Sequence, residues 1–290
     1  MAIELSTARR LWRLLEPIHA VTYFSDETRE ALAAAGYRGF WMGYFAGRAA
    51  PLGEVGPEIV TALFYNFAPD HVARAIPDAW RFAPPETAID VRRQAAVATL
   101  QRMLGSAGND EVVDRVVALL RPAAQNADLG GRALFAANAA LPWPEDRHGA
   151  LWHAATLLRE HRGDGHVAAL TTAGVTGREA GVLHSSAAAI PRSVLETSRK
   201  YTPDEWSALT ERLAERGLLD HSGAITPSGR ALKGDIETTT DRLAAPAYNI
   251  LSEVEVDELT SALMTLTKTV VASGDIPSVT PMGLDLDDVG

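Results

Sequence analysis

The chain contains no cysteine among its 290 residues, and this absence excludes several kinds of site. Disulfide bonds, thiolate nucleophiles, cysteine-based zinc sites and iron–sulfur clusters all require that side chain. The sequence also lacks an uninterrupted apolar run of about 18 residues, the length that a membrane-spanning helix needs. Charged residues interrupt residues 1–19, so the hydrophobic core of a secretion signal is missing. These absences predict a soluble, cytoplasmic protein.

The motifs of nucleotide and metal chemistry are absent as well. The sequence has no G-x-x-x-x-G-K-[ST] loop, no G-x-G-x-x-G string after a strand and no G-x-S-x-G elbow. It also lacks H-E-x-x-H, H-x-H and carboxylate-rich spacings that are typical of metal ligands. We therefore expect neither a cofactor nor a metal site.

The charge of the chain is unevenly distributed. Residues 1–145 carry 14 basic and 16 acidic side chains, whereas residues 146–290 carry 13 and 21, giving net charges of −2 and −8. Domains that bind duplex DNA are usually basic, because lysine and arginine must displace phosphate counterions. The acidic second half therefore counts against DNA binding there.

Apolar residues recur at intervals of three and four along an alanine-rich chain, which predicts a mostly helical fold. Ser25 is expected to cap a helix, Gly36 to end it, and Pro17 to kink or break the helix before it. A further helix should open at Pro69. The other helices are expected over residues 8–24, 26–35, 38–49, 57–65, 86–104 and 110–125.

Two parts of the chain are similar to each other. Residues 34–52 align without gaps to residues 172–190, with identities that include the pairs Gly36/Gly174 and Gly43/Gly181. Residues 18–24 align to 152–158, which places His19 on His153. The pair Pro69-Asp70 aligns in the same order to Pro203-Asp204. This order of segments predicts a tandem duplication that packs around a pseudo-twofold axis.

Residues 203–232 show the order helix, hairpin, helix, which is typical of a winged helix. Strands are expected at 218–219 and 224–226, between a helix that ends at Gly217 and one that begins near Pro227. The strings RGLL (216–219) and TPSGRAL (226–232) resemble those of MarR-type regulators. This resemblance implies a DNA-recognition helix within 203–220. However, that segment has five acidic residues against two arginines, and the tip His221-Ser222-Gly223 is not basic, so we favour a scaffold role.

Over nearly its full length, the chain is also similar to an actinobacterial family of helix-turn-helix proteins. The similarity lies in the strings EPIHAVTYF (16–24), RAAPLG (48–53), FYNF (64–67) and TDRL (240–243). It implies the duplicated helical architecture, but no particular activity.

We therefore expect an all-α protein with a small β-wing. Two diverged, MarR-like winged-helix-like repeats, over residues 1–142 and 146–274, should form a pseudo-dimer, and the wing of the first repeat is lost. Residues 275–290 should be a flexible acidic tail.

Polar residues within apolar helices are the candidate catalytic groups. Glu16 and His19 are three residues apart and Tyr23 lies four further on, so all three share one helix face. A carboxylate beside an imidazole is the arrangement of a general base and its orienting group. Arg48 stands in an uncharged stretch and could hold an anion. The alternatives are that Glu16 and His19 hold the kinked helix in place, and that Arg48 is a buried partner of an acid.

Aromatic and amide side chains in the first half suggest a pocket for a small molecule. Phe45, Tyr65 and Asn66 would line it together with Tyr23 and Arg48. His184 is a further candidate contact from the second half. The alternative is that the aromatic residues simply form a hydrophobic core.

These features favour a small-molecule-binding protein on a degenerate winged-helix scaffold. It would be a sensor, or a cofactor-free enzyme with His19 as base, Glu16 as its orienting group and Arg48 as anion clamp, acting on an apolar or aromatic metabolite. The alternative is a MarR-like DNA-binding transcriptional regulator, and a third interpretation is a protein–protein adaptor. Binding and catalysis remain open, as does the choice between monomer and homodimer.

Overall fold

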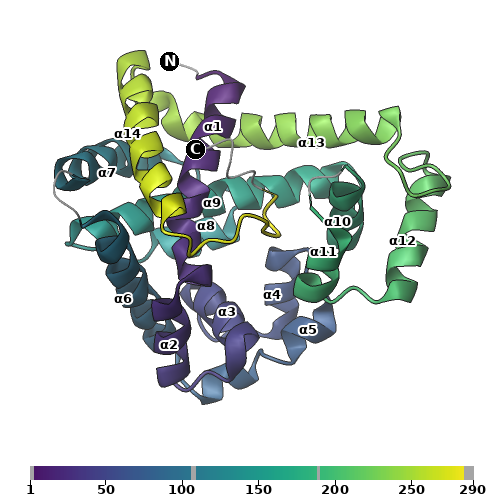
Figure 1. Ribbon diagram of the computed structural model, residues 1–290, viewed down its shortest axis with the longest axis horizontal. Coiled ribbons are helices and arrows are strands. Elements are labelled where there is room, and N and C mark those ends of the chain that lie inside the picture. Colours follow the sequence, from purple (N-terminus) through teal and green to yellow (C-terminus); the bar gives the residue numbers. More distant parts are fainter. Residues whose placement is uncertain (1–2, 106–108, 188–189, 284–290) are drawn as a thin grey trace.

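The computed structural model describes residues 3–105, 109–187 and 190–283, and within these ranges the protein is built from helices (Figure 1). The expected all-α fold is confirmed. The α-helices are α1 (Leu5–Phe24), α2 (Asp26–Ala34), α3 (Gly39–Ala49), α4 (Pro57–Phe64), α5 (Pro69–Ala73), α6 (Pro85–Leu104), α7 (Asn109–Asn126), α8 (Ala133–Ala139), α9 (Arg147–Thr172), α10 (Gly177–Ser186), α11 (Arg192–Arg199), α12 (Pro203–Glu215), α13 (Pro227–Ala244) and α14 (Glu253–Ala272). The 3-10 helices are η1 (Ala50–Leu52), η2 (Asp78–Arg81) and η3 (Ala245–Ile250). None of the described helices is long and apolar enough to cross a membrane.

Local signals set many of the helix boundaries. The Ser25 hydroxyl accepts a hydrogen bond from the backbone N–H of Thr28 at 3.3 Å and so caps α2, as expected. Gly36 follows that helix with a φ of +102°, a conformation that favours glycine. Of the kink or break expected at Pro17, the break does not occur, because α1 runs through this residue from Leu5 to Phe24. The neighbours of Pro17 are buried, so tertiary packing supports the helix around the missing hydrogen bond.

The expected β-wing does not form as a pair of strands. A single antiparallel bridge joins Leu219 to Ile225, and no strand occurs in the described residues. The turn is closed by Asp220, whose carboxylate accepts hydrogen bonds from the backbone N–H groups of Ser222 at 2.8 Å and Ala224 at 3.0 Å. Because α13 begins at Pro227, the hairpin ends before a longer ladder can be built.

Helices α1 and α9 pack against each other in the largest hydrophobic core. Helices α6, α7 and α14 complete this core, which contains residues from both predicted repeats. The packing between the two predicted repeats is also reciprocal. Helix α1 of the first repeat contacts α14 of the second, and α9 of the second contacts α7 of the first. Polar residues of α1 and α9 are therefore placed in the middle of the molecule.

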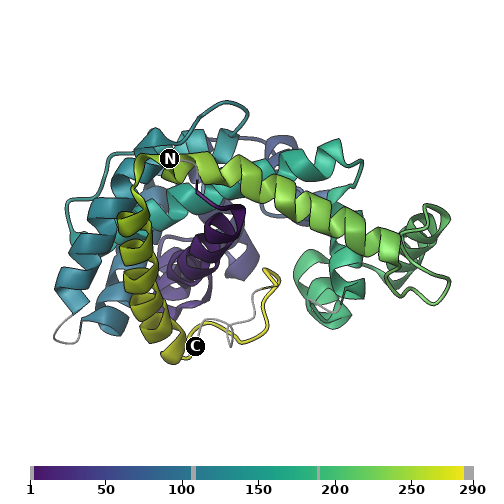
Figure 2. The same cartoon turned by 90° about the horizontal axis from the view of Figure 1, so that it is seen from above.

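Two smaller cores flank the central one. The first lobe is residues 26–91, with a core of its own from α2 to α5. The second lobe is residues 169–236, whose core includes α10, α11 and α12. Figure 2 shows that α13 runs from the body of the protein to this second lobe, which projects to one side. The face of α12 that does not contact the core is therefore open to solvent.

The predicted acidic tail lies partly outside the described residues, which end at Gly283. In the described part, Ile276 and Thr280 are buried, with relative exposures of 4% and 2%. The three aspartates at 285, 287 and 288 lie outside it.

Candidate functional site

Four charged side chains form a buried network between α1, α3 and α9. Glu160 accepts two hydrogen bonds from the Arg48 guanidinium, both at 3.1 Å, and one from Arg159 at 2.9 Å. Arg159 also donates to both carboxylate oxygens of Glu16, at 3.2 and 3.3 Å. The side chains of Glu16 and Glu160 are each only 2% exposed. We call Glu16, Arg48, Arg159 and Glu160 the central charge network.

The charges of this network stabilise one another. Burial alone would raise the pKa of Glu160, but the guanidinium groups of Arg48 and Arg159 outweigh it and hold that pKa well below its usual range. Arg48 also lies over the ring of Phe64, with its Cζ 4.2 Å from the ring centroid. These contacts match the alternative interpretation, in which Arg48 is the buried partner of an acid. The acid is Glu160.

His19 is buried beside this network but does not contact Glu16 through a hydrogen bond. Its Nδ1 lies 2.9 Å from the Thr156 hydroxyl and its Nε2 lies 2.8 Å from the Tyr23 hydroxyl. Its ring stacks on Trp152 at a centroid distance of 6.4 Å. The expected pairing of Glu16 with His19 is therefore not formed, because the carboxylate binds a fully charged guanidinium on α9 instead.

Burial and the neighbouring Arg159 lower the pKa of His19 well below its usual value. Burial likewise raises the pKa of the Tyr23 phenol. Both side chains are neutral at physiological pH, so they can offer hydrogen bonds in this site without adding charge.

The remaining candidate contacts do not gather around His19. Phe45 is fully buried in the core of the first lobe, where its ring lies 5.0 Å from that of Phe67. The Tyr65 hydroxyl donates to the carbonyl of Val175 at 2.8 Å, and thereby joins the two lobes. His184 lies on α10 in the second lobe. Phe45 is thus a core residue, in agreement with the alternative considered for the aromatic residues.

Asn66 belongs to the same junction between the lobes. Its carbonyl accepts a hydrogen bond from Arg178 at 3.1 Å, and its side-chain oxygen accepts one from Arg199 at 3.1 Å. Tyr65 has a φ of +54°, which is unusual for a residue other than glycine. Tyr65 and Asn66 therefore connect the two lobes and do not line the site at His19.

A cavity of about 20 Å³ lies between His19 and the central charge network. That is room for about one water molecule. The cavity is lined by His19, Thr22, Tyr23, Leu32, Gly43, Tyr44, Gly47, Arg48, Arg92 and Glu160. Sequence reasoning missed Arg92, Arg159 and Glu160, although charged residues within an apolar helix were the signal that singled out Arg48.

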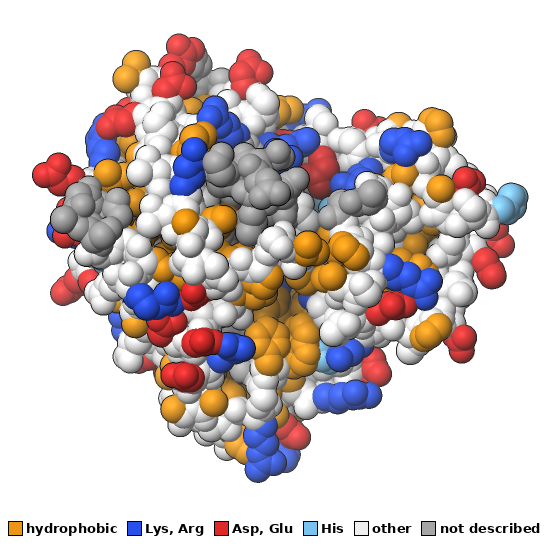
Figure 3. All heavy atoms as spheres, viewed as in Figure 1, with side chains coloured by type: hydrophobic (Ala, Val, Ile, Leu, Met, Phe, Trp, Pro, Cys, Tyr) orange, Lys and Arg blue, Asp and Glu red, His pale blue; other side chains and the backbone are white. Residues whose placement is uncertain are grey.

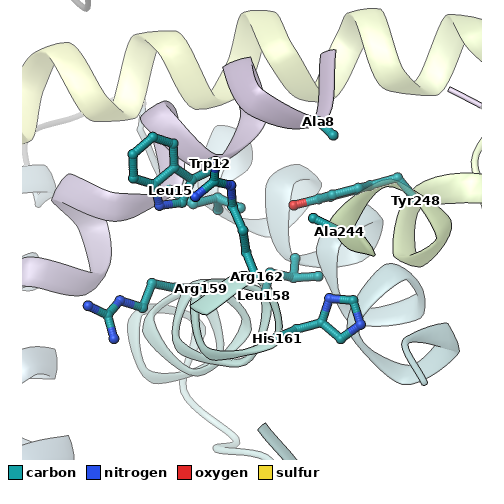
Figure 4. A pocket seen from close by; sticks show the side chains of 9 residues that line it. All are labelled: Ala8, Trp12, Leu15, Leu158, Arg159, His161, Arg162, Ala244 and Tyr248. Carbon is teal, nitrogen blue, oxygen red and sulfur yellow. The ribbon is translucent and has the colours of Figure 1, made fainter. Parts of the chain in front are cut away.

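A second group of charged side chains lies further along α9, between α1 and α13. Arg162 donates to Glu237 and to Asp241, each at 3.1 Å, and Asp241 also pairs with Arg9. Figure 4 shows Arg162 passing the ring of Trp12, while Arg159 leaves α9 in a different direction. The Arg162 Cζ is 4.0 Å from the centroid of that ring. Side chains fill the space here, so this group is a structural connection between α1, α9 and α13.

The buried histidines make the protein sensitive to acid. Burial lowers the pKa of His153 to about 4, below the value of about 6.5 expected in the unfolded chain. Below pH 6.5 the unfolded state binds a proton that the folded state does not, so the stabilising contribution of His153 is present above pH 6.5 and is lost as the pH falls toward 4.

Between about pH 7.5 and pH 5.5, the protein should lose about 1 kcal/mol of unfolding free energy through His153. Urea unfolding at both pH values measures the loss of unfolding free energy. In His153→Gln the loss should be smaller by the contribution of His153. Equal losses in the two proteins would contradict the prediction.

Helices α11 and α12 follow one another on the second lobe and are joined by residues 200–202. Leu195 of α11 and Leu209 and Leu213 of α12 are buried in its core. Lys200 joins the helices in a left-handed conformation with a φ of +56°. The opposite, solvent-exposed face of α12 carries Asp204, Ser207, Ala208, Glu211, Arg212 and Glu215.

Comparison with known proteins shows the family of this chain. A model of the helix-turn-helix family matches residues 8–277, which is most of the chain. No curated protein and no solved structure matched the sequence. Because the match extends over both lobes and the central core, the protein belongs to the helix-turn-helix family.

Proposed function

We propose that the protein is a DNA-binding transcriptional regulator that contacts DNA through α12. The observation that carries this proposal is the exposed helix-turn-helix unit of α11 and α12 in a chain of the helix-turn-helix family. In such units the second helix enters the major groove with its N-terminal residues at the base edges. Helix α12 lies at the outer edge of the projecting lobe (Figure 1).

The charges on this lobe predict how the protein would bind. Arg212 and Arg230 are exposed, and Arg216 is partly exposed while it pairs with Glu179 at 3.5 Å. Glu205 at the start of α12 is held by Arg178 at 2.7 Å, so part of the acidic charge is already compensated. With about three phosphate contacts, the logarithm of the binding constant should fall with the logarithm of the salt concentration with a slope of about −3.

The MarR-like duplication remains part of this proposal. The reciprocal packing of α1 on α14 and of α9 on α7 supports two repeats around a pseudo-twofold axis. In the first half, α5 has only five residues where the second half has α12. A first repeat with so short a helix would leave the second lobe as the one that contacts DNA.

Selection from a random duplex library with the full-length protein, followed by fluorescence anisotropy across a salt series, tests the proposal. Replacing both Arg212 and Arg216 by Ala should weaken binding by about 1–3 kcal/mol and reduce the salt slope by about 2. The matched control replaces Arg115 and Lys268, which are exposed on α7 and α14, and should change neither quantity. If no sequence is enriched, or if both double variants behave alike, the proposal is incorrect.

A second function, the binding of a small molecule between α1, α3 and α9, is favoured by one specific observation. The water-sized cavity beside His19 shares Tyr23 with an open groove of about 440 Å³ that includes Phe24 and Phe40. Figure 3, in the same view as Figure 1, shows hydrophobic side chains gathered in the middle of the visible face of the protein. Native mass spectrometry of the freshly purified protein tests this function: a stoichiometric excess mass that disappears on denaturation supports it.

A further inference from the structure

The buried charges around His19 do not balance. Arg48, Arg92 and Arg159 supply three positive charges, and Glu16 and Glu160 supply two negative ones. The Arg92 side chain is buried, with a relative exposure of 6%. Since a buried charge without a counter-ion is costly, one excess positive charge in this region requires an explanation.

Arg92 has only neutral hydrogen-bond acceptors. Its guanidinium donates to the carbonyl of Gly47 at 2.9 Å and to the side-chain oxygen of Asn138 at 2.8 Å. Its buried Nε has no hydrogen-bond partner. Burial lowers the pKa of Arg92 to about 10, so the group still carries its charge at neutral pH. The side chain also lines the cavity beside His19.

The other polar side chains of this cavity mostly supply hydrogen-bond donors. Tyr44 carries a hydroxyl donor, and Arg48 has guanidinium N–H groups beyond the two that bind Glu160. Glu160 is already bound by two arginines. A cavity with this lining favours an acceptor that carries negative charge. Because the cavity holds about one water molecule, it has room for only the head of a larger ligand.

The body of such a ligand has a place in the adjoining groove. The ring of Tyr44 lies 5.0 Å from that of Tyr23 and 6.1 Å from that of Phe40, so the two phenol rings stand between cavity and groove. Phe40 is 43% exposed although it is a large apolar residue. Tyr23 lines both spaces, so the cavity and the groove meet at this side chain.

We propose that an aromatic monocarboxylate binds here, with its carboxylate beside Arg92 and its ring in the groove at Phe40. One excess positive charge matches a carboxylate, whereas a phosphate monoester carries about −1.5 to −2 at neutral pH. In the groove, Arg29 pairs with Asp26 and Asp275 pairs with Arg102, so the lining offers no unpaired positive charge for a second negative one. This assignment rests on the small-molecule function proposed above and is independent of DNA binding.

Titration calorimetry of the full-length protein with benzoate and with neutral benzamide tests the assignment. Benzoate should bind with a stoichiometry of one and at least about tenfold more tightly than benzamide, because a charge-assisted hydrogen bond distinguishes them. Arg92→Met should remove this preference, while Arg92→Lys should retain part of it. Phe40→Ala should weaken the binding of both probes to a similar degree. Because Phe40 is exposed, this variant does not alter the core.

The outcomes distinguish the assignment of an aromatic anion from the small-molecule function on which it rests. Equal binding of benzoate and benzamide would leave the pocket in place but overturn the assignment of an anion. Binding of neither probe at about 10 mM would overturn both the assignment of the ligand and the small-molecule function, since that limit corresponds to a negligible affinity. Acetate or chloride that binds as tightly as benzoate would overturn the aromatic part of the ligand.

Discussion

Replacing Glu160 by Gln should lower the free energy of unfolding by about 3–5 kcal/mol, because it leaves two buried arginines without a shared counter-ion. Glu160 holds Arg48 through two hydrogen bonds and Arg159 through one. Glutamine keeps the size of the side chain, so the loss comes from charge and not from a cavity. Arg159 would retain Glu16, whereas Arg48 would lose its ion pair.

Urea unfolding at about pH 7.5 measures the effect, and an exposed ion pair supplies the control. Glu258 pairs with Arg115 at 2.6 Å, but both side chains are more than 40% exposed. Glu258→Gln should therefore cost much less than Glu160→Gln. The combination of Glu160→Met with Arg48→Met should recover part of the loss, since it removes the unpaired charge. A loss below about 1 kcal/mol for Glu160→Gln would show that the network is not a tightly coupled buried pair.

Gly177→Ala should destabilise the protein by about 3 kcal/mol and loosen the second lobe. A Cβ at this position would collide with the carbonyl oxygen of Tyr65 and lie 3.0 Å from the Cα of Asn66. Both neighbours are backbone atoms, so no side chain can move aside. The hydrogen bonds from Tyr65 to Val175 and from Arg178 to Asn66 cross this contact and would be strained with it.

Gly234→Ala is the matched control, because a Cβ there meets nothing within 4 Å in the interior of α13. It should stabilise the protein by about 0.5–1 kcal/mol, as alanine has the higher helix propensity. Urea unfolding measures both variants, and limited proteolysis should show faster cleavage within the second lobe in Gly177→Ala. If the two variants had similar stability, the close packing of the lobes at Gly177 would be incorrect.

The helical fold could be predicted because its signals are local. The hydroxyl of Ser25 reaches an amide three residues away, and the glycines at 36 and 217 have φ values of +102° and +70° that few other residues adopt. Such contacts lie within one helical turn, so the sequence carries them directly. The expected hairpin shows the limit, since the turn at His221-Ser222-Gly223 was evident but the length of the strands was not.

The sequence by itself determined which residues form helices and which charged groups stand in apolar surroundings. Only the tertiary structure decided how those groups pair, because their partners are distant along the chain. Glu16 binds Arg159 and Arg48 binds Glu160, across separations of 143 and 112 residues. Periodicity places Glu16 and His19 on one face of α1. The ion pair of Glu16 with Arg159 on α9 is the stronger interaction, so it decides the direction of the carboxylate.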